Sequence, residues 1–500
     1  MKILLKNIFS DRKLIVTLSL ILILHLFLRL YHAEANLGFG HDEDLGGWIA
    51  KDIIADHNFR LIGQETSIDG LFIGPLFYYL QAGYFALFNM DPIGGLYLTL
   101  TISVITFFSI YYVFRRFFGL NTALTGVFLY AGSQALAGHD TWIVPTQPTL
   151  LWTTWFLFAL FYIIKEGNPK IFLLLGVLLG LIWYIHIAFV PLILLIFLAF
   201  FVSKKRPVLK KIIFNRQTFF GIIIFLFLML PFFAFEIRHN FTQTQSLIKS
   251  LSEDRHQENG RIFKVYDGVS WSFMNIIYEI RNTNPDWIRI YQAVMLFIFT
   301  GMLMANAKYL GRYGVVIYGW LGLVIISQLI SKRAISEYYF TNLSVLEILT
   351  IAVFLTGLTK KNYLKIFVLI LLAIFAILNL DSVIKRLPNG EGYLMRKKLV
   401  AFIAKDAKKN NYPCISINYM TSPGKNAGFR YFFWLNGLNV ISTGNDVAVY
   451  SILNPAVMSE KEIADREGVL GVILPDKPRV DEAACKKPER RLLPPWRFNN

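Results

Sequence analysis

Cysteine is nearly absent from this sequence, and acidic residues are scarce. Cys414 and Cys485 are the only cysteines among 500 residues, so we expect neither a disulfide framework nor a cysteine metal site. Asp and Glu number 33 against 50 Lys and Arg, which gives a net charge of +17. The basic residues gather in short segments between apolar runs, as the positive-inside rule describes for membrane proteins. We therefore expect no nucleic-acid partner.

Long polar stretches are also missing from most of the chain. Hydrophobic residues make up 55% of it, aromatic residues 16%, and the mean hydropathy is +0.49. Many apolar runs reach the roughly 20 residues that cross a bilayer, which predicts a multi-pass protein of the plasma (inner) membrane. The first run, Leu14 to Tyr31, is not followed by a small-residue cleavage site, so we predict an uncleaved first span rather than a signal peptide.

Basic residues between the apolar runs set the predicted orientation. With the N-terminus inside, a span at Leu71 to Phe88 would leave Arg115 and Arg116 outside and reverse every later basic loop. That stretch is rich in Phe and Tyr, which suit a membrane interface, so we predict an outer interfacial helix there. A polar outer loop is expected from Glu236 to Asp286. About eleven spans follow, at residues 14–32, 93–114, 121–137, 147–164, 171–202 (two short spans meeting outside near His186), 217–235, 287–306, 313–331, 338–358 and 364–384.

The composition changes near Leu387. Short apolar runs punctuated by Asn-Pro and Pro-Asp pairs predict strands at Cys414–Tyr419, Val447–Leu453 and Val469–Leu474, with a helix at Glu460–Arg466. The fold class is therefore mainly α: a polytopic membrane helical bundle with a small C-terminal α/β domain. We place the membrane module at residues 1–386 and an extracytoplasmic domain at 387–500.

Three consecutive carboxylates, Asp42, Glu43 and Asp44, follow the first span within a few residues. Apolar residues recur after them at helical spacing, which predicts a short helix lying on the membrane surface. Because acidic clusters beside a bilayer are costly, this stretch invites a functional interpretation. A solvated loop with a chance acidic run is the alternative.

The polar residues that look out of place in a membrane protein all fall on the predicted outer side. They are Asp42, Glu43, Asp44, His139, Asp140, His186, Glu236, Arg238, His239, Glu337 and Tyr338. Secondary transporters hold such groups at mid-membrane depth on broken helices, whereas these border the spans at one surface. An active site that faces one leaflet is favoured over a lipid-linked sugar flippase or transporter, and a non-enzymatic scaffold is a weaker alternative.

In their order along the chain, several motifs resemble the GT-C superfamily of integral membrane glycosyltransferases. The resemblance is strongest to the bacterial relatives of protein O-mannosyltransferases and of the lipid A aminoarabinose transferase, and it covers roughly residues 14–350. The motifs are the pair Asp42-Glu43, the helix through Ile49–Asp52, the segment Gly70–Tyr79, the segment Trp142–Pro148, the span-breaking His186 and the segment Pro231–Phe241. The C-terminal region has no such match.

This resemblance implies an inverting glycosyltransferase that moves a sugar from a polyprenyl phosphate in the membrane to an extracytoplasmic acceptor, which is a lipid, a glycan or a protein. The catalytic Asp of the family opens the pair, so the resemblance assigns the general base to Asp42. Glu43 and Asp44 are like charges next to it and are expected to raise its pKa. Asp44 is not part of the family pair, which leaves open which carboxylate acts.

The departing phosphate needs a cation, and Arg238 can grip a phosphate with two hydrogen bonds. His239, Lys51, Arg60 and the Lys332-Arg333 pair are alternatives, and a simple interface anchor is another interpretation of Arg238.

The remaining candidates carry two interpretations each. A core or cavity-lining histidine is favoured over a catalytic one for His186. Glu337 and Tyr338 either contact the sugar or acceptor or anchor the end of a span. Asp140 with Asp42 or Asp44 is the set that would hold a divalent metal, as in the oligosaccharyltransferase branch. The more similar O-mannosyltransferase branch works without metal, so no cofactor is firmly predicted.

Overall fold

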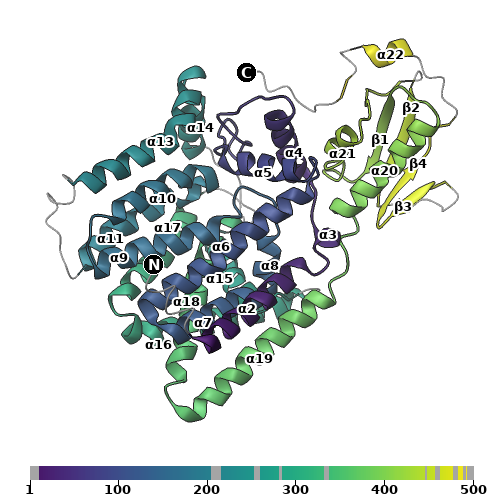
Figure 1. Cartoon of the computed structure of the whole chain (residues 1–500). Helices are drawn as coiled ribbons and strands as arrows, with labels where there is room; N and C mark the ends of the chain where they lie inside the picture. Colours follow the sequence, from purple (N-terminus) through teal and green to yellow (C-terminus); the bar gives the residue numbers. More distant parts are fainter. Residues whose placement is uncertain are drawn as a thin grey trace.

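The computed structural model describes most of the chain, apart from ten short segments. The described residues are 11–203, 215–252, 260–280, 284–331, 337–444, 447–455, 462–476, 482–487 and 491–492. A helical bundle makes up most of the molecule, and a small sheet lies beyond one end of it (Figure 1).

Seven helices in the described residues are long and apolar enough to cross a membrane. They are α2 (Arg12–Leu30), α6 (Ile93–Phe118), α13 (Arg216–Arg238), α16 (Pro285–Leu310), α17 (Arg312–Ile330), η3 with α18 (Thr341–Leu343 and Ser344–Leu358) and α19 (Asn362–Ile384). Shorter apolar helices accompany them, namely α9 (Thr149–Lys165), α10 (Ile171–Ile185) and η1 with α11 (Ile187–Ile193 and Leu194–Val202). The prediction of a multi-pass helical membrane protein is confirmed, and the number of eleven crossings stays a prediction.

The long apolar run from residue 171 to 202 is divided at His186, as predicted. Helix α10 ends at Ile185, His186 has extended backbone, and its Nδ1 accepts a hydrogen bond from the backbone N–H of Ala188 at 3.1 Å. Helices α10 and α13 approach each other most closely at two glycines, because a Cβ atom on Gly176 would lie 2.1 Å from the carbonyl oxygen of Gly221. This close approach explains why both positions are glycine.

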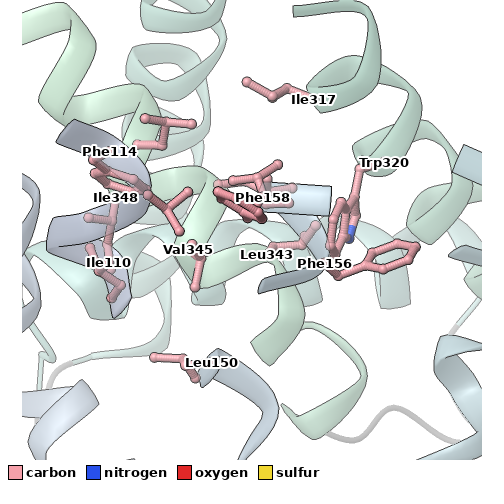
Figure 2. Packing of buried hydrophobic residues seen from close by; sticks show 14 of the residues in the cluster. Ile110, Phe114, Leu150, Phe156, Phe158, Ile317, Trp320, Leu343, Val345 and Ile348 are labelled. Atoms are coloured by element: carbon pink, nitrogen blue, oxygen red, sulfur yellow. The ribbon is translucent and has the colours of Figure 1, made fainter. Parts of the chain in front are cut away.

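The membrane core is built around α9, which is buried on nearly every side. Its Phe156 and Phe158 pack with residues of α6, α17 and α18, among them Trp320 and Val345 (Figure 2). The indole N–H of Trp320 is satisfied by Asn342 Oδ1 at 2.8 Å. A buried Trp needs such a partner, so this contact fixes the start of α18 against α17.

Two helices outside the bundle carry the predicted interfacial segments. Helix α4 (His41–Ile54) follows the four-residue α3 (Ala33–Asn36), and α5 (Leu76–Leu87) packs against α4 (Figure 1). With 12 residues, α5 is about 18 Å long, well short of the roughly 30 Å hydrocarbon core. It is therefore too short to cross the membrane, as its aromatic composition predicted.

The predicted polar loop between residues 236 and 286 contains two helices, so a simple loop is wrong there. Helix α14 (Thr242–Ser252) lies beyond α13, and α15 (Arg261–Ile277) packs on α16, α17 and α18. Apolar residues at helical spacing bury one face of α15. A Cβ atom on Gly268 would lie 2.1 Å from the Phe340 ring, so that glycine allows the contact between α15 and the turn before α18.

The C-terminal region contains a four-stranded sheet in the order β1-β2-β4-β3. Its elements are α20 (Tyr393–Lys409), β1 (Ile415–Thr421), α21 (Arg430–Leu435), β2 (Ala448–Asn454), β3 (Asp465–Glu467), β4 (Leu470–Ile473) and α22 (Glu482–Lys486). Strands β1 and β2 are parallel, and β4 pairs antiparallel with both β2 and β3. The three predicted strands are confirmed.

Two predictions for this region need correction. The helix expected at Glu460–Arg466 is wrong, because residues 462–464 are not helical and Asp465 begins strand β3; residues 460 and 461 lie outside the described chain. Cys414 and Cys485 form a disulfide with their Cα atoms 5.6 Å apart, against our expectation. The fold of the C-terminal region brings Cys414, just before β1, to Cys485 in α22, 71 residues later in the sequence, and their spacing alone does not reveal such a pair.

Candidate active site

The acidic stretch forms the first turn of α4, and Glu43 holds that turn in place. Its Oε2 accepts a hydrogen bond from the backbone N–H of Gly40 at 2.8 Å, as in a capping box. Its Oε1 accepts the indole N–H of Trp142 at 3.0 Å. Burial raises the pKa of Glu43, and these hydrogen bonds oppose the rise. Glu43 therefore links the start of α4 to the segment before α9.

Asp44 points into the C-terminal region. It is 7% exposed, and its Oδ1 accepts the backbone N–H of Tyr431 at 3.0 Å. Burial raises the pKa of Asp44 to about 6, while the Tyr431 hydrogen bond and the positive charges of Arg430 and Arg396 oppose the rise. The third carboxylate thus has a structural partner far away in sequence.

Asp42 differs from both neighbours. Its side chain is 50% exposed, and within the described chain its hydrogen-bonding partner is the adjacent His41, with Nδ1 3.4 Å from Oδ1. That contact with Asp42 raises the pKa of His41, and burial opposes the rise. Of the three carboxylates, Asp42 alone accepts no backbone hydrogen bond in the described residues, so its oxygen atoms are available to a ligand.

A cavity of about 760 Å³ is lined in part by Trp142, the partner of Glu43, and its lining includes none of the three carboxylates. Its walls come from α8 (Gln134–Asp140), α15, η3 and the short helix η2 (Glu337–Tyr339). The polar and aromatic side chains in the lining include Gln134, His139, Trp142, Thr146, Asp267, Trp271, Ser272, Asn275, Glu279, Tyr338, Thr341 and Arg386. A volume of this size accommodates a drug-sized ligand, and the mixture of rings, acids and amides suits a polar one.

Sequence reasoning missed the α15 wall of this cavity. Asp267, Trp271 and Asn275 follow one another at intervals of four residues, so they occupy one face of the helix. Ser272, which also lines the cavity, donates a hydrogen bond at 2.9 Å to Glu347, which is fully buried in α18. The four-residue spacing of polar residues within the supposed loop was the signal that would have found this wall.

Asp140 lies inside the bundle and is absent from the cavity lining. Arg29 of α2 approaches its Oδ2 at 2.6 Å, and the hydroxyl of Tyr130 donates to the same oxygen at 2.7 Å. Both Arg29 and Asp140 are 1% exposed. Asp140 therefore connects α8 to α2 through Arg29 and to α7 (Leu120–Gly132) through Tyr130.

The residues at the outer end of α13 lie apart from the cavity lining. Arg238 is exposed, and the His239 ring stacks on Phe235 with the ring centres 4.0 Å apart. Glu236 is buried and accepts hydrogen bonds from the backbone N–H groups of Gln243 and Thr244, at 3.0 and 3.1 Å. Glu236 thus caps α14, while Arg238 remains accessible.

The other predicted residues occupy three different settings. His186 is buried, with its ring 4.8 Å from that of Tyr338, which lines the cavity. The ammonium of Lys51 pairs with Asp56 and lies 5.9 Å from the Trp434 ring, and Arg60 pairs with Asp52. The Glu337 side chain and the Lys332-Arg333 pair lie outside the described part of the chain.

The described residues contain no group of three His, Cys, Asp or Glu side chains arranged to hold a metal ion. The Asp140 carboxylate, which the metal alternative requires, is enclosed by Arg29 and Tyr130. The described residues that the metal alternative requires therefore do not fit a divalent cation.

The profile of the dolichyl-phosphate-mannose-protein mannosyltransferase family matches residues 73–235, about a third of the chain. No curated protein matches it by sequence.

Solved structures show a likeness over nearly the whole chain. The structure of ArnT from Cupriavidus metallidurans bound to undecaprenyl phosphate has a TM-score of 0.60 at 10% identity, covering 94% of this chain and 99% of that one. The apo state of the same protein gives 0.58 at 10% identity, over 92% and 97%. The archaeal oligosaccharyltransferase AglB from Archaeoglobus fulgidus, in complex with an inhibitory peptide and a dolichol-phosphate, gives 0.50 at 11% identity, over 89% and 70%. At these identities the likeness establishes a shared fold.

Proposed function

We propose that this chain, which has the fold of the GT-C superfamily of membrane glycosyltransferases, is an enzyme that transfers a sugar from a polyprenyl phosphate to an extracytoplasmic acceptor with inversion. The mannosyltransferase family match and the undecaprenyl-phosphate and dolichol-phosphate complexes of the similar structures support this class of donor.

One observation carries the proposal: Asp42 is an accessible carboxylate on a turn whose other two acids are held by structural partners. Glu43 binds Gly40 and Trp142, and Asp44 binds Tyr431. Such an arrangement fixes the backbone and leaves a single carboxylate for chemistry, which supports Asp42 as the general base.

The reaction needs few groups from the protein. Asp42 takes the proton of the acceptor hydroxyl, and the oxygen attacks the anomeric carbon from the face opposite the phosphate. The bond between that carbon and the phosphate oxygen breaks, and the polyprenyl phosphate leaves with the electron pair. One carboxylate acting as base on one face gives inversion, by the logic that applies to inverting sugar hydrolysis.

The cavity beside Trp142 is the proposed chamber for the hydroxyl-rich part of a substrate. Its lining holds two tryptophans that offer flat apolar faces, and Asp267 and Asn275 that accept or donate hydrogen bonds to hydroxyls. Arg238 is the proposed cation for the carrier phosphate, outside this chamber, because its guanidinium is exposed at the end of α13.

We place the active site and the C-terminal region outside the cell. The disulfide between Cys414 and Cys485 supports this side, because disulfides persist in oxidising compartments. This support is independent of the charge pattern, which concentrates basic residues at the opposite ends of the spans.

A synthetic polyprenyl-phosphate sugar, incubated with the purified protein and a panel of acceptors without a membrane gradient, tests the proposal. Transfer or release of sugar by the wild-type chain, and its loss in Asp42→Ala, is the expected result. A protein that moves the lipid across vesicles but never cleaves it would be a flippase and would refute the proposal. Normal turnover in Asp42→Ala together with an inactive Asp44→Ala would reassign the base.

A further inference from the structure

One face of α4 is covered by the C-terminal region. Asp44, Gly47, Trp48 and Lys51 lie at positions i, i+3, i+4 and i+7, which share one side of a helix. All four contact α21 of the C-terminal region, at Tyr431 or Trp434. Asp42 precedes Asp44 by two residues and therefore lies about 200° around the helix. The covered side of α4 is opposite the side that carries the proposed base.

Tyr431 is the centre of this contact. Its backbone N–H donates to Asp44, and its fully buried ring lies against Gly47, where a Cβ atom would approach ring atom Cδ2 to 2.9 Å. Its hydroxyl donates to the carbonyl oxygen of Met90 at 2.8 Å, in the turn after α5. A single side chain thus connects both interfacial helices to the C-terminal region.

The chain that leads into α4 is held by the same region. The backbone N–H of Tyr393, at the start of α20, donates to the carbonyl oxygen of Leu37 at 2.9 Å. The Phe432 ring lies 4.7 Å from that of Phe39. These residues, α4, α5 and the sheet share one buried hydrophobic cluster. Contacts on both sides of the acidic stretch therefore fix the backbone around Asp42.

We propose that the C-terminal region is a positioning element of the transferase: α21, through Tyr431, sets the orientation of α4 and so aims Asp42 at the acceptor hydroxyl. This inference rests on the proposed function, because it gives Asp44, Gly47 and Tyr431 a role through Asp42. A displacement of about 1 Å at a reacting group costs roughly a hundredfold in rate, so a small tilt of α4 is sufficient to impair catalysis.

The test uses two neighbouring glycines of the full-length protein. Gly47→Ala inserts a methyl group against the Tyr431 ring, whereas the atoms nearest to a Cβ atom on Gly46 belong to the end of the Gln81 side chain, at 3.1 Å. Alanine favours helix over glycine by about 1 kcal/mol at either position, so both variants stabilise α4 itself. We expect Gly47→Ala to lower kcat roughly 10- to 100-fold with KM for the donor unchanged. Gly46→Ala should keep at least half of the wild-type kcat.

A second variant separates positioning from folding. Tyr431→Phe keeps the ring and the backbone hydrogen bond to Asp44 but removes the hydroxyl that binds Met90. We expect a fall in kcat of a few-fold with only a small decrease in the melting temperature, because a single neutral hydrogen bond is lost. In the double variant with Gly47→Ala, the loss should be smaller than the product of the two single losses, because both act on one contact.

The outcomes distinguish the two proposals. Absence of transfer by the wild-type chain with every donor would refute the proposed function itself. Wild-type turnover with normal kcat in both Gly47→Ala and Tyr431→Phe would overturn the positioning role alone. A parallel loss of donor binding and kcat in Tyr431→Phe would also overturn it, because that pattern indicates general unfolding.

Discussion

The start of α4 and the end of α8 both present an acidic side chain, but they hold it in opposite ways. Asp42 on α4 is half-exposed and has the adjacent His41 as its partner in the described chain. Asp140 on α8 is enclosed by Arg29 and Tyr130. A buried ion pair holds two helices together, because removing either partner leaves an unpaired buried charge and destabilises the fold. A carboxylate without such partners can instead bind and exchange a proton. The comparison teaches that the partners of an acid, and not its place at one membrane surface, indicate its role.

The largest expected effect is the loss of turnover in Asp42→Asn. This change keeps the shape of the side chain and removes its ability to take a proton. General-base catalysis contributes about 10²–10⁴ in rate, so kcat should fall by that factor. The melting temperature should stay at the wild-type value, because no buried partner loses its charge. Normal turnover of Asp42→Asn would contradict the role of Asp42 as general base, and with it the functional distinction between Asp42 and Asp140.

Asp140→Asn should act on the fold instead. It leaves Arg29 buried without a counter-charge, and breaking such a pair costs about 3–5 kcal/mol. We expect a markedly lower melting temperature in detergent and a loss of activity that follows the loss of folded protein.

A double replacement sharpens this second prediction. Arg29→Met with Asp140→Leu exchanges the pair for apolar residues, which is often neutral for stability. Recovery of both folding and turnover would confirm that Asp140 is structural. Recovery of folding without turnover would show that Asp140 also serves the substrate.

The different partners of these acids also show which contacts could not be predicted from the sequence. The apolar runs predicted the long helices, the break at His186 and the short aromatic helix α5, because each depends on local composition. The ion pair of Asp140 depends on Arg29, which is 111 residues away in the first apolar run. No local pattern connects such residues, and the same holds for the disulfide and for the parallel pairing of β1 with β2.

The candidate site was predictable to a similar extent. The acidic triplet and Trp142 stand out in the sequence, and the structure brings Glu43 and Trp142 into contact. The α15 wall was missed because a polar segment was taken as a loop despite its helical spacing. The docking of Tyr431 on α4 was missed for another reason, since one glycine and one tyrosine nearly 400 residues apart carry no recognisable pattern.

Two arginines differ in burial in the same way as Asp140 and Asp42 do. Arg29 is enclosed, while Arg238 is exposed at the end of α13. A charge-assisted phosphate contact is worth about 1.5–3 kcal/mol, so Arg238→Ala should weaken donor binding roughly ten- to a hundredfold. Arg238→Lys should recover part of it, because lysine lacks the bidentate geometry.

Binding of a non-hydrolysable polyprenyl phosphonate sugar measures this effect, with acceptor KM as the control that should not change. Unaltered donor affinity in both variants would place the phosphate elsewhere. Lys51 and Arg60 are weaker substitutes, because each already pairs with a carboxylate of its own segment, Asp56 or Asp52.

The smallest expected effect concerns Asp44, which stands between the two extremes because it is buried but keeps one backbone donor. Its pKa is raised from 3.8 to about 6, mainly by burial, so the folded protein binds this proton more tightly than the unfolded chain does. The resulting stability is fully present below about pH 4 and is lost as the pH rises through about 6, with a limit of about 3 kcal/mol for two pKa units.

Asp44→Asn keeps an oxygen that can accept the Tyr431 N–H but cannot titrate. The wild-type melting temperature should therefore rise relative to that of the variant as the pH is lowered from 7.5 to 5. The difference between the two curves is the measurement, because the raised pKa of His41 changes the wild-type curve in the same direction. Parallel curves would mean that Asp44 keeps its ordinary affinity for protons in the folded protein, and that its burial against Tyr431 carries no electrostatic cost.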